Sequence, residues 1–392
     1  MLKNDFKSLE LSIILIINQK RNDLIIQKEN IVDMEITHTI MEPFKTGYLN
    51  IEDRLQYNLM LNNYPYTKLY FNAIDMYGAS YKEFFIVTNI HLMKNEKGDT
   101  LRIEFIDEIT WNMLNYYKSK GYVNTYFKQI FQEYYNNINT ISLIPKPLHT
   151  AGNNFKEGVL YSNVVIPNNL SFMKYFFTKQ HMHGLIFYVN RNNSFLIDIA
   201  KLTTMSLDAT GTHVYSFPKK DSEIDKMNPF TIYEINISKA KRLDMNLKFP
   251  NSYISWFDSA SKTPHVNVVS TNSFYSNISA KPSVPVDTLG ERQSYLGKIH
   301  QSSNVKSTAQ PIQYVHDMIK NTLNNTTINI LTHGGFINDI GLLVQIAVPV
   351  GADNQGYDKS LSGTYLVTDI IDKYSFSKGF YQKITLMRYS TN

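Results

Sequence analysis

The chain has 392 residues, enough for two to four compact units that each bury a core of their own. Its 39 basic and 34 acidic residues leave a formal charge of +5 and are dispersed, unlike the clustered basic residues of a nucleic-acid binder. The absence of cysteine excludes disulfides, thiolate metal sites and a cysteine nucleophile. The 27 tyrosines and 22 phenylalanines, in runs with isoleucine, valine and threonine, predict a mainly β protein.

The first part of the chain, residues 1–111, predicts an antiparallel β module of small-barrel or sandwich type. Apolar and polar residues alternate along Leu101–Phe105, and Gly98 can supply a positive φ in the preceding turn. The apolar run 11–17 is too short to cross a bilayer and lacks a cleavage site, so we expect a buried strand there and no membrane insertion. Strands are expected at 9–17, 31–38, 46–51, 67–75, 83–91 and 100–107.

Residues 112–204 change to a mixed pattern that predicts an α+β insert, a helix-hairpin domain. Apolar residues from Val123 to Tyr134 recur at helical spacing up to Asn136-Asn137, and a second helix is expected over Leu170–Gln180. Runs at 185–189 and 195–199 then predict a hairpin. A strand at 230–237 is expected to return the chain to the first sheet, so that 205–250 completes the first module.

Residues 251–312 are rich in serine and proline. Prolines such as Pro264 are expected to break regular structure, which favours an arm or linker. Residues 313–392 then predict a short helix at 315–323 and a second β module. Its strands are expected at 328–331, 342–348, 365–371 and 382–387.

One short pattern occurs twice, nearly three hundred residues apart. VTNI begins at Val87 and VTDI begins at Val367, and each is followed by a turn and a second strand. From the valine to the isoleucine of that second strand the two copies span 16 and 17 residues. We therefore predict two equivalent tube-like modules, in which strands 83–91 and 100–107 superpose on 363–371 and 381–388. Their expected signature residues are Val87, Thr88, Ile90, Ile103, Gly334, Gly341, Gly363, Tyr365, Val367, Thr368, Ile370 and Ile384.

No local motif predicts catalysis, a cofactor or a metal. His181 and His183 stand at strand spacing, but zinc needs three or four ligands and no cysteine or acid is adjacent. The pair Gly334-Gly335 has no G-x-S-x-G partner and is better explained as a turn that needs a positive φ. Catalysis by a pair of carboxylates at glycosidase spacing stays open as an alternative, although no acid stands in a distinctive pattern.

The whole chain resembles the baseplate hub subunits of contractile phage tails and the related hub region of spike proteins in contractile injection machines. A helix, a glycine and a hairpin follow one another in Asn169–Asp198. A strand, a glycine turn and a valine-rich strand form Ile328–Ile346, where Ile340 replaces the commoner proline before Gly341. A glycine, an aromatic residue and a closing hairpin form Gly363–Arg388.

The resemblance implies a structural virion protein in the tail baseplate, assembled in the host cytoplasm. It implies a homotrimer that joins a sixfold tail tube ring to a threefold central spike and contacts other baseplate proteins. The enclosed channel would pass the tape-measure protein and then DNA in transit. The resemblance implies no reaction and no cofactor. Two alternatives stay open, namely the hub of a phage-derived injection particle or secretion system and a tail-associated peptidoglycan hydrolase.

Overall fold

The computed structural model of the chain describes part of its length, and every structural statement below concerns that part. Within it the fold is mainly β with three α-helices, which confirms the predicted fold class. The large sheet is open at both ends, so the small-barrel form of the expectation is wrong. The described residues are 9–17, 22–40, 44–54, 56–62, 66–95, 98–151, 160–166, 171, 173, 185–198, 213–217, 228–239, 252–258, 263–269, 294–296, 326–350, 356–358 and 361–388.

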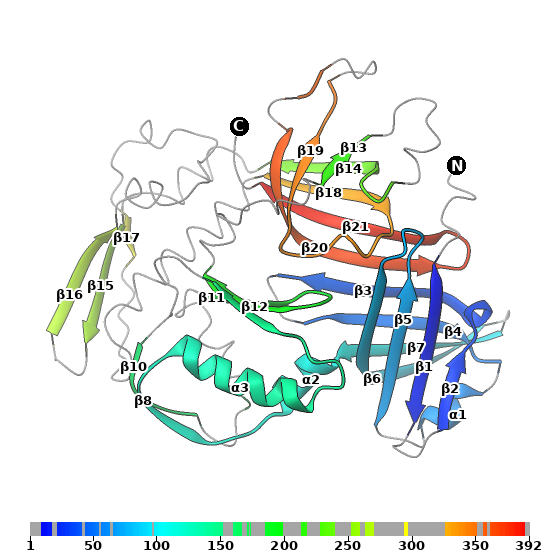
Figure 1. Cartoon of the computed structure of the whole chain (residues 1–392), viewed down its shortest axis with the longest axis horizontal. Coiled ribbons are helices and arrows are strands. Elements are labelled where there is room, and N and C mark those ends of the chain that lie inside the picture. The colour runs from blue at the N-terminus through cyan, green and yellow to red at the C-terminus, as the bar shows by residue number, and fades with distance from the viewer. Residues whose placement is uncertain are drawn as a thin grey trace.

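One 13-stranded sheet runs through the molecule and contains both ends of the described chain (Figure 1). Two short strands lie off its main path: β19 (Leu343–Ala347) pairs with β20, and β13 (Val214–Ser216) pairs with β19. The main path reads β14 (Ile232–Lys239), β18 (Thr326–His333), β21 (Gly379–Arg388), β20 (Gly363–Ser375), β3 (Ile31–Thr39), β4 (Thr46–Glu52), β7 (Gly98–Asp107), β6 (Ser80–Asn95), β5 (Thr67–Ile74), β1 (Glu10–Ile17) and β2 (Asn22–Ile26).

The alternation of the sequence decides which face of this sheet is buried. In β7, Leu101 and Ile103 are fully buried, whereas Arg102 and Glu104 remain partly exposed. The same inward and outward alternation holds in β3, β4, β20 and β21. One face therefore packs on the cores while the other stays polar, as period-2 strands require.

The sheet contains two similar four-stranded antiparallel units that lie side by side. The N-terminal unit is β3-β4-β7-β6 and the C-terminal unit is β14-β18-β21-β20. They join where β20 pairs with β3, from Asp369 opposite Thr39 to Ser375 opposite Asp33. We call this pairing the seam.

Both units carry register shifts at equivalent places. In the β6–β7 hairpin the shift lies between Val87 and Asn89, and in the β20–β21 hairpin it lies between Val367 and Asp369. The threonine at each shift hydrogen-bonds to the partner strand, Thr88 to the carbonyl of Glu104 at 3.1 Å and Thr368 to that of Thr385 at 3.3 Å. The repeated VT dipeptide thus marks a repeated β-bulge.

A second pair of register shifts extends the match between the two units to the first strand of each unit. It lies between Ile31 and Asp33 in β3 and between Ile232 and Glu234 in β14. Each register also aligns a row of four residues across its unit. The rows are Met34–Leu49–Ile103–Ile90 and Ile235–Ile330–Ile384–Ile370.

The segment expected to complete the first module pairs elsewhere. The strand β14 forms as predicted, but its partner is β18, and β13 pairs with β19. Both partners come from the last seventy residues, so the described strands of 205–250 extend the C-terminal half of the sheet. The sequence could not show this, because strand partners far apart in the chain leave no local pattern.

The insert forms a hydrophobic core of its own. The helix α3 begins at Phe127, and Val123 and Tyr126 lie in β8, so the predicted helix starts too early. The pairing of β8 with β10 overrides the helical spacing, and α3 also continues past Asn136-Asn137. The expected hairpin is present as β11 and β12, while the expected helices at 170–180 and 315–323 lie outside the described residues, Ser171 and Met173 excepted. The elements are α2 (Glu108–Asn115), β8 (Lys120–Tyr126), α3 (Phe127–Ile141), β9 (Leu148–Ala151), β10 (Leu160–Ile166), β11 (Leu185–Val189) and β12 (Ser194–Asp198), with α1 (Tyr57–Asn62) and the 3-10 turn η1 (Lys28–Asn30) in the first module.

The serine-rich stretch contains regular structure, contrary to the expectation of an arm without it. A three-stranded sheet has the order β16-β15-β17. Pro264 lies inside β16, which is an edge strand, and an edge position tolerates proline because no ladder hydrogen bond needs its missing N–H. The strands are β15 (Ser252–Asp258), β16 (Thr263–Val269) and β17 (Ser294–Leu296).

Candidate functional site

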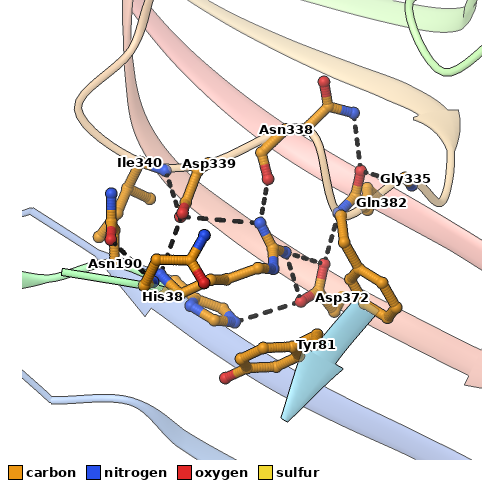
Figure 2. Close-up of polar contacts among 12 residues, drawn as sticks. His38, Tyr81, Asn190, Gly335, Asn338, Asp339, Ile340, Asp372 and Gln382 are labelled. Atoms are coloured by element: carbon orange, nitrogen blue, oxygen red, sulfur yellow. Dashed lines mark hydrogen bonds and ion pairs between the residues drawn. The ribbon is translucent and has the colours of Figure 1, made fainter. Parts of the chain in front are cut away.

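A buried polar junction lies where the insert meets the seam of the large sheet (Figure 2). Arg191 stands at the tip of the β11–β12 hairpin, where the Asn190 side chain accepts hydrogen bonds from the backbone N–H groups of Asn192 and Asn193 at 3.0 and 2.7 Å. Such an asparagine turn fixes the tip and aims Arg191 away from its own strands. The Arg191 side chain is 2% exposed.

The guanidinium group of Arg191 binds Asp372 of β20 through two hydrogen bonds of 2.9 and 2.7 Å. It also donates to the carbonyl of Asn338, and the backbone N–H of Arg191 donates to Asp339 at 3.0 Å. Asp339 and Asn338 belong to the loop after β18, so one side chain fastens the insert to two parts of the C-terminal unit. Both bonds to Asp372 come from one guanidinium nitrogen while the other terminal nitrogen donates to Asn338, so the contacts orient the side chain as well as pair its charge.

Asp372 has further partners. Gln382 donates to it at 2.6 Å, and the Nε2 atom of His38 lies 3.2 Å from it. Burial alone would raise the pKa of Asp372, but the charge of Arg191 and the contact with His38 hold that pKa well below its usual range. Burial lowers the pKa of His38 despite the nearby carboxylate, so this histidine is neutral at neutral pH.

A second cluster adjoins the first through the backbone of Asn190. The ammonium groups of Lys45 and Lys146 donate to the Asn190 carbonyl at 2.8 and 3.1 Å, and both pair with Glu83 of β6. Burial, together with the neighbouring charge of Lys45, lowers the pKa of Lys146 to about 8 despite the opposing charge of Glu83. The backbone of Lys45 donates to Asp107 at 3.0 Å. The hairpin tip is thus held by both units of the sheet.

The charged groups of this junction are nearly all buried and paired with one another, so they fix one another's positions. Paired buried charges add little net stability, but each one strongly disfavours any arrangement that separates it from its partner. Among the described residues, no group of three histidine or acidic side chains could hold a metal ion.

The junction also marks where the two units differ. The register places Asp372 and Gln382 at the positions that Leu92 and Leu101 occupy in the N-terminal unit. The polar pair of Asp372 and Gln382 is present in the C-terminal unit, which is the unit whose carboxylate Arg191 binds. The single insert of each chain therefore distinguishes two otherwise equivalent units.

No local pattern in the sequence predicts this site, because its members are spread from residue 38 to residue 382. One signal was available. In β20 an aspartate stands at an inward position between Ile370 and Tyr374, and in β21 a glutamine precedes Ile384 with the same parity. A charged residue on the buried side of a strand requires a buried partner.

The residues expected as module signatures occupy particular places in the structure. Val367, Ile370, Ile103 and Ile384 are buried, and Val87 and Ile90 pack partly on the N-terminal core. Gly341 has φ +82°, and a side chain there would overlap the Tyr188 ring. Two further residues in the signature, Gly363 and Tyr365, begin β20.

The explanation offered for Gly334-Gly335 is wrong. The positive-φ glycines of the described chain are Gly78, Gly98, Gly341, Gly363 and Gly379, which confirms the expected turn at Gly98 but does not include this pair. A side chain at Gly334 would overlap the ring of Phe380, and one at Gly335 would meet Pro229. Close packing, not backbone conformation, is what requires glycine there. His181 and His183 lie outside the described residues.

Two strand edges that bound the four-stranded units have no partner in the described part of the chain. Residues 89–95 of β6 pair with β7 on one side, while β5 pairs only with residues 80–86 of β6. Residues 234–239 of β14 pair with β18 on one side only. We call these the β6 edge and the β14 edge.

The uncovered face of the sheet carries charges of both signs that contact one another across the strands. Lys373 of β20 pairs with Glu35 of β3, so the contacts continue over the seam. Arg102 lies 3.2 Å from Glu104 and 3.8 Å from the ring centre of Tyr48. We call this the polar face, and its members include Asp33, Glu35, Tyr48, Asn50, Arg102, Glu104, Asp369, Lys373, Lys383 and Thr385.

Comparison with known proteins gives a match in fold. No protein-family profile and no curated protein matches the sequence. The tail protein of Neisseria meningitidis MC58 aligns with a TM-score of 0.58 at 10% identity over 96% of both chains. The 43 kDa tail protein of prophage MuSo2 from Shewanella oneidensis gives 0.52 at 12% identity, over 96% of this chain and 98% of that one.

A third similar structure comes from a secretion system. The E. coli c3393 protein, described as a component of the type VI secretion system with structural similarity to T4 bacteriophage tail proteins gp27 and gp5, gives a TM-score of 0.50 at 8% identity. The alignment covers 96% of this chain and 77% of that protein. The chain therefore has a fold similar to that of these tail proteins and of the secretion-system component, and this agrees with the resemblance found in the sequence.

Proposed function

We propose that this protein is a structural hub of a tail baseplate, forming a homotrimeric ring between a tail tube and a central spike. The observation that carries the proposal is the pair of equivalent four-stranded units in one chain, matched by two β-bulges each. The fold shared with phage tail proteins supports it.

Symmetry explains why one chain would contain two such units. A tube made of sixfold rings offers six equivalent docking positions, whereas a spike below it has threefold symmetry. Three chains with two units each provide six similar surfaces, and the insert, present once per chain, keeps the true symmetry threefold. The two units of a subunit would then be related by a rotation of about 60° in a closed ring.

The polar face is suited to line the channel of this ring. Its charges are of both signs and contact one another, so they present little net field to a polyanion. A wall of this kind would let the tape-measure protein and DNA pass without holding them. We infer no catalytic role, and incubation of the purified protein with cell-wall sacculi tests this, since turnover of peptidoglycan would contradict it.

A second candidate is the equivalent hub of an injection particle or secretion system. The likeness to the E. coli secretion-system component favours it as much as the tail proteins favour a phage. Neighbouring genes for a capsid and for DNA packaging would indicate a phage, and their absence beside tail genes would indicate the second candidate.

The oligomeric mass tests the proposal. Light scattering of the purified chain of 45.4 kDa should give three times that mass. A monomer or dimer at every concentration, or a ring of another order at the end of assembled tubes, would contradict the proposed ring.

A further inference from the structure

The β6 edge and the β14 edge are complementary ends of the two four-stranded units. Each four-stranded unit has a first strand, β3 or β14, and a last strand, β6 or β20. Inside the chain, the last strand of the C-terminal unit pairs with the first strand of the N-terminal unit at the seam. The last strand of the N-terminal unit and the first strand of the C-terminal unit provide the β6 edge and the β14 edge.

The side chains at these edges fit burial against another strand. Ile90 and Leu92 of β6 and Ile235 and Ile237 of β14 pack on the cores yet stay partly exposed. The equivalent Ile370, Asp372, Met34 and Ile36 at the seam are all buried. Unpaired aliphatic edges attract other strands, and proteins normally cover or pair them. The seam shows what covers this kind of edge in this fold.

We propose that the β6 edge of one copy pairs antiparallel with the β14 edge of the next copy, in the register of the seam. This rests on the proposed ring and adds its contact surface. The bulges make residue 89 equivalent to residue 369 and residue 34 equivalent to residue 235. The residue pairs of the seam between β20 and β3 can therefore be converted into residue pairs between β6 and β14. This conversion places His91 opposite Ser238, Leu92 opposite Ile237, and Met93 opposite Asn236.

The proposed pairing is chemically consistent on both faces. Leu92 and Ile237 meet on the core face, where the seam has Asp372 opposite Ile36. His91, Met93, Ser238 and Asn236 are exposed and would lie on the polar face. Each copy offers one edge of each kind, so the contact is head-to-tail and three copies close it.

Disulfide formation tests the register, because the natural chain has no cysteine. The variant His91→Cys/Ser238→Cys puts thiols on directly opposed residues, and Met93→Cys/Asn236→Cys does so two residues further along. Directly opposed residues on paired strands are close enough to bridge, whereas diagonal ones lie about 7–8 Å apart, beyond the usual reach of a disulfide. The crossed variant His91→Cys/Asn236→Cys is therefore the matched register control.

The seam supplies a positive control within one chain. Thr37 lies opposite Ile371, the position equivalent to the proposed contact of Ser238 with His91. Thr37→Cys/Ile371→Cys should oxidise inside single chains and give no linked species. This shows that the geometry permits a bridge, and circular dichroism of each variant confirms that it folds.

On oxidation, both opposed pairs should link chains up to a trimer and no further, and the crossed pair should link at least tenfold less. A trimeric mass without links at the opposed pairs, or with stronger links at the crossed pair, overturns the register and leaves the proposed ring standing. Links that continue beyond three chains overturn the closed contact. A monomeric mass at every concentration, together with no links, overturns the ring and the register alike.

Discussion

Replacing Arg191 by alanine should destabilise the protein in a way that depends on pH. The change removes both hydrogen bonds to Asp372 and the contact with Asn338 and leaves a buried carboxylate with only Gln382 and His38. Removing one partner of a buried ion pair costs about 3–5 kcal/mol. The two charge-assisted hydrogen bonds and the 2% exposure of the Arg191 side chain place this site in that range.

The pH dependence follows from His38. In the natural protein, burial lowers the pKa of His38. The stability that this histidine contributes is therefore present above its ordinary pKa of about 6.5 and is lost as the pH falls below that value. Without Arg191, no neighbouring guanidinium opposes protonation while Asp372 still favours it, so the pKa of His38 rises. A protonated His38 would partly replace the lost charge, and the destabilisation should be smaller at about pH 5.5 than at about pH 8.

Urea unfolding followed by circular dichroism measures this at both pH values, and a matched variant isolates the pair. Asp372→Leu introduces the residue that the N-terminal unit has at the equivalent Leu92. The double variant Arg191→Ala/Asp372→Leu should therefore lose less than the sum of the two single variants, by about 2 kcal/mol. A cost below about 1 kcal/mol for Arg191→Ala at both pH values, or strict additivity, would refute the reasoning about the junction.

Three further predictions address other parts of the chain. Val367→Asp should lower the free energy of unfolding by several kcal/mol and prevent assembly on the tube, because Val367 is 1% exposed in the middle of β20. Complete tails built from this variant would contradict the burial of this position. His181→Ala/His183→Ala should show no metal-dependent change in melting temperature, and a chelator that lowers the melting temperature of the natural protein by several degrees would reveal a metal site. The purified protein should bind DNA weakly at physiological salt, and tight binding with a steep salt dependence would contradict a non-adhesive channel wall.

The sequence predicted the strands of both modules well, because period-2 alternation and glycine turns are local signals. Leu101 and Ile103 alternate with charged residues, and the same parity continues in the structure. The VT repeat pointed to two hairpins that lie in one sheet and carry register shifts at equivalent places, while their superposition stays a prediction. The bulge itself was not foreseen, although the threonine that hydrogen-bonds there was part of the repeated pattern.

The errors came from pairings between distant residues. Val123 and Tyr126 have helical spacing with Phe127, but they form a strand because residues 160–166 pair with them. The strand at β14 was predicted and its partner was not, since β18 lies about ninety residues further along the chain. The junction was invisible for the same reason: Arg191 looks like an ordinary turn residue until the fold brings Asp372 beside it.

Images of the isolated assembly viewed along its axis test the central claim most directly. We expect a closed ring of three chains whose sheet shows six similar lobes, with the units of each chain related by about 60° and the inserts repeating three times. An assembly of another copy number, or a trimer in which the two units of each chain do not take equivalent places around the channel, would contradict it.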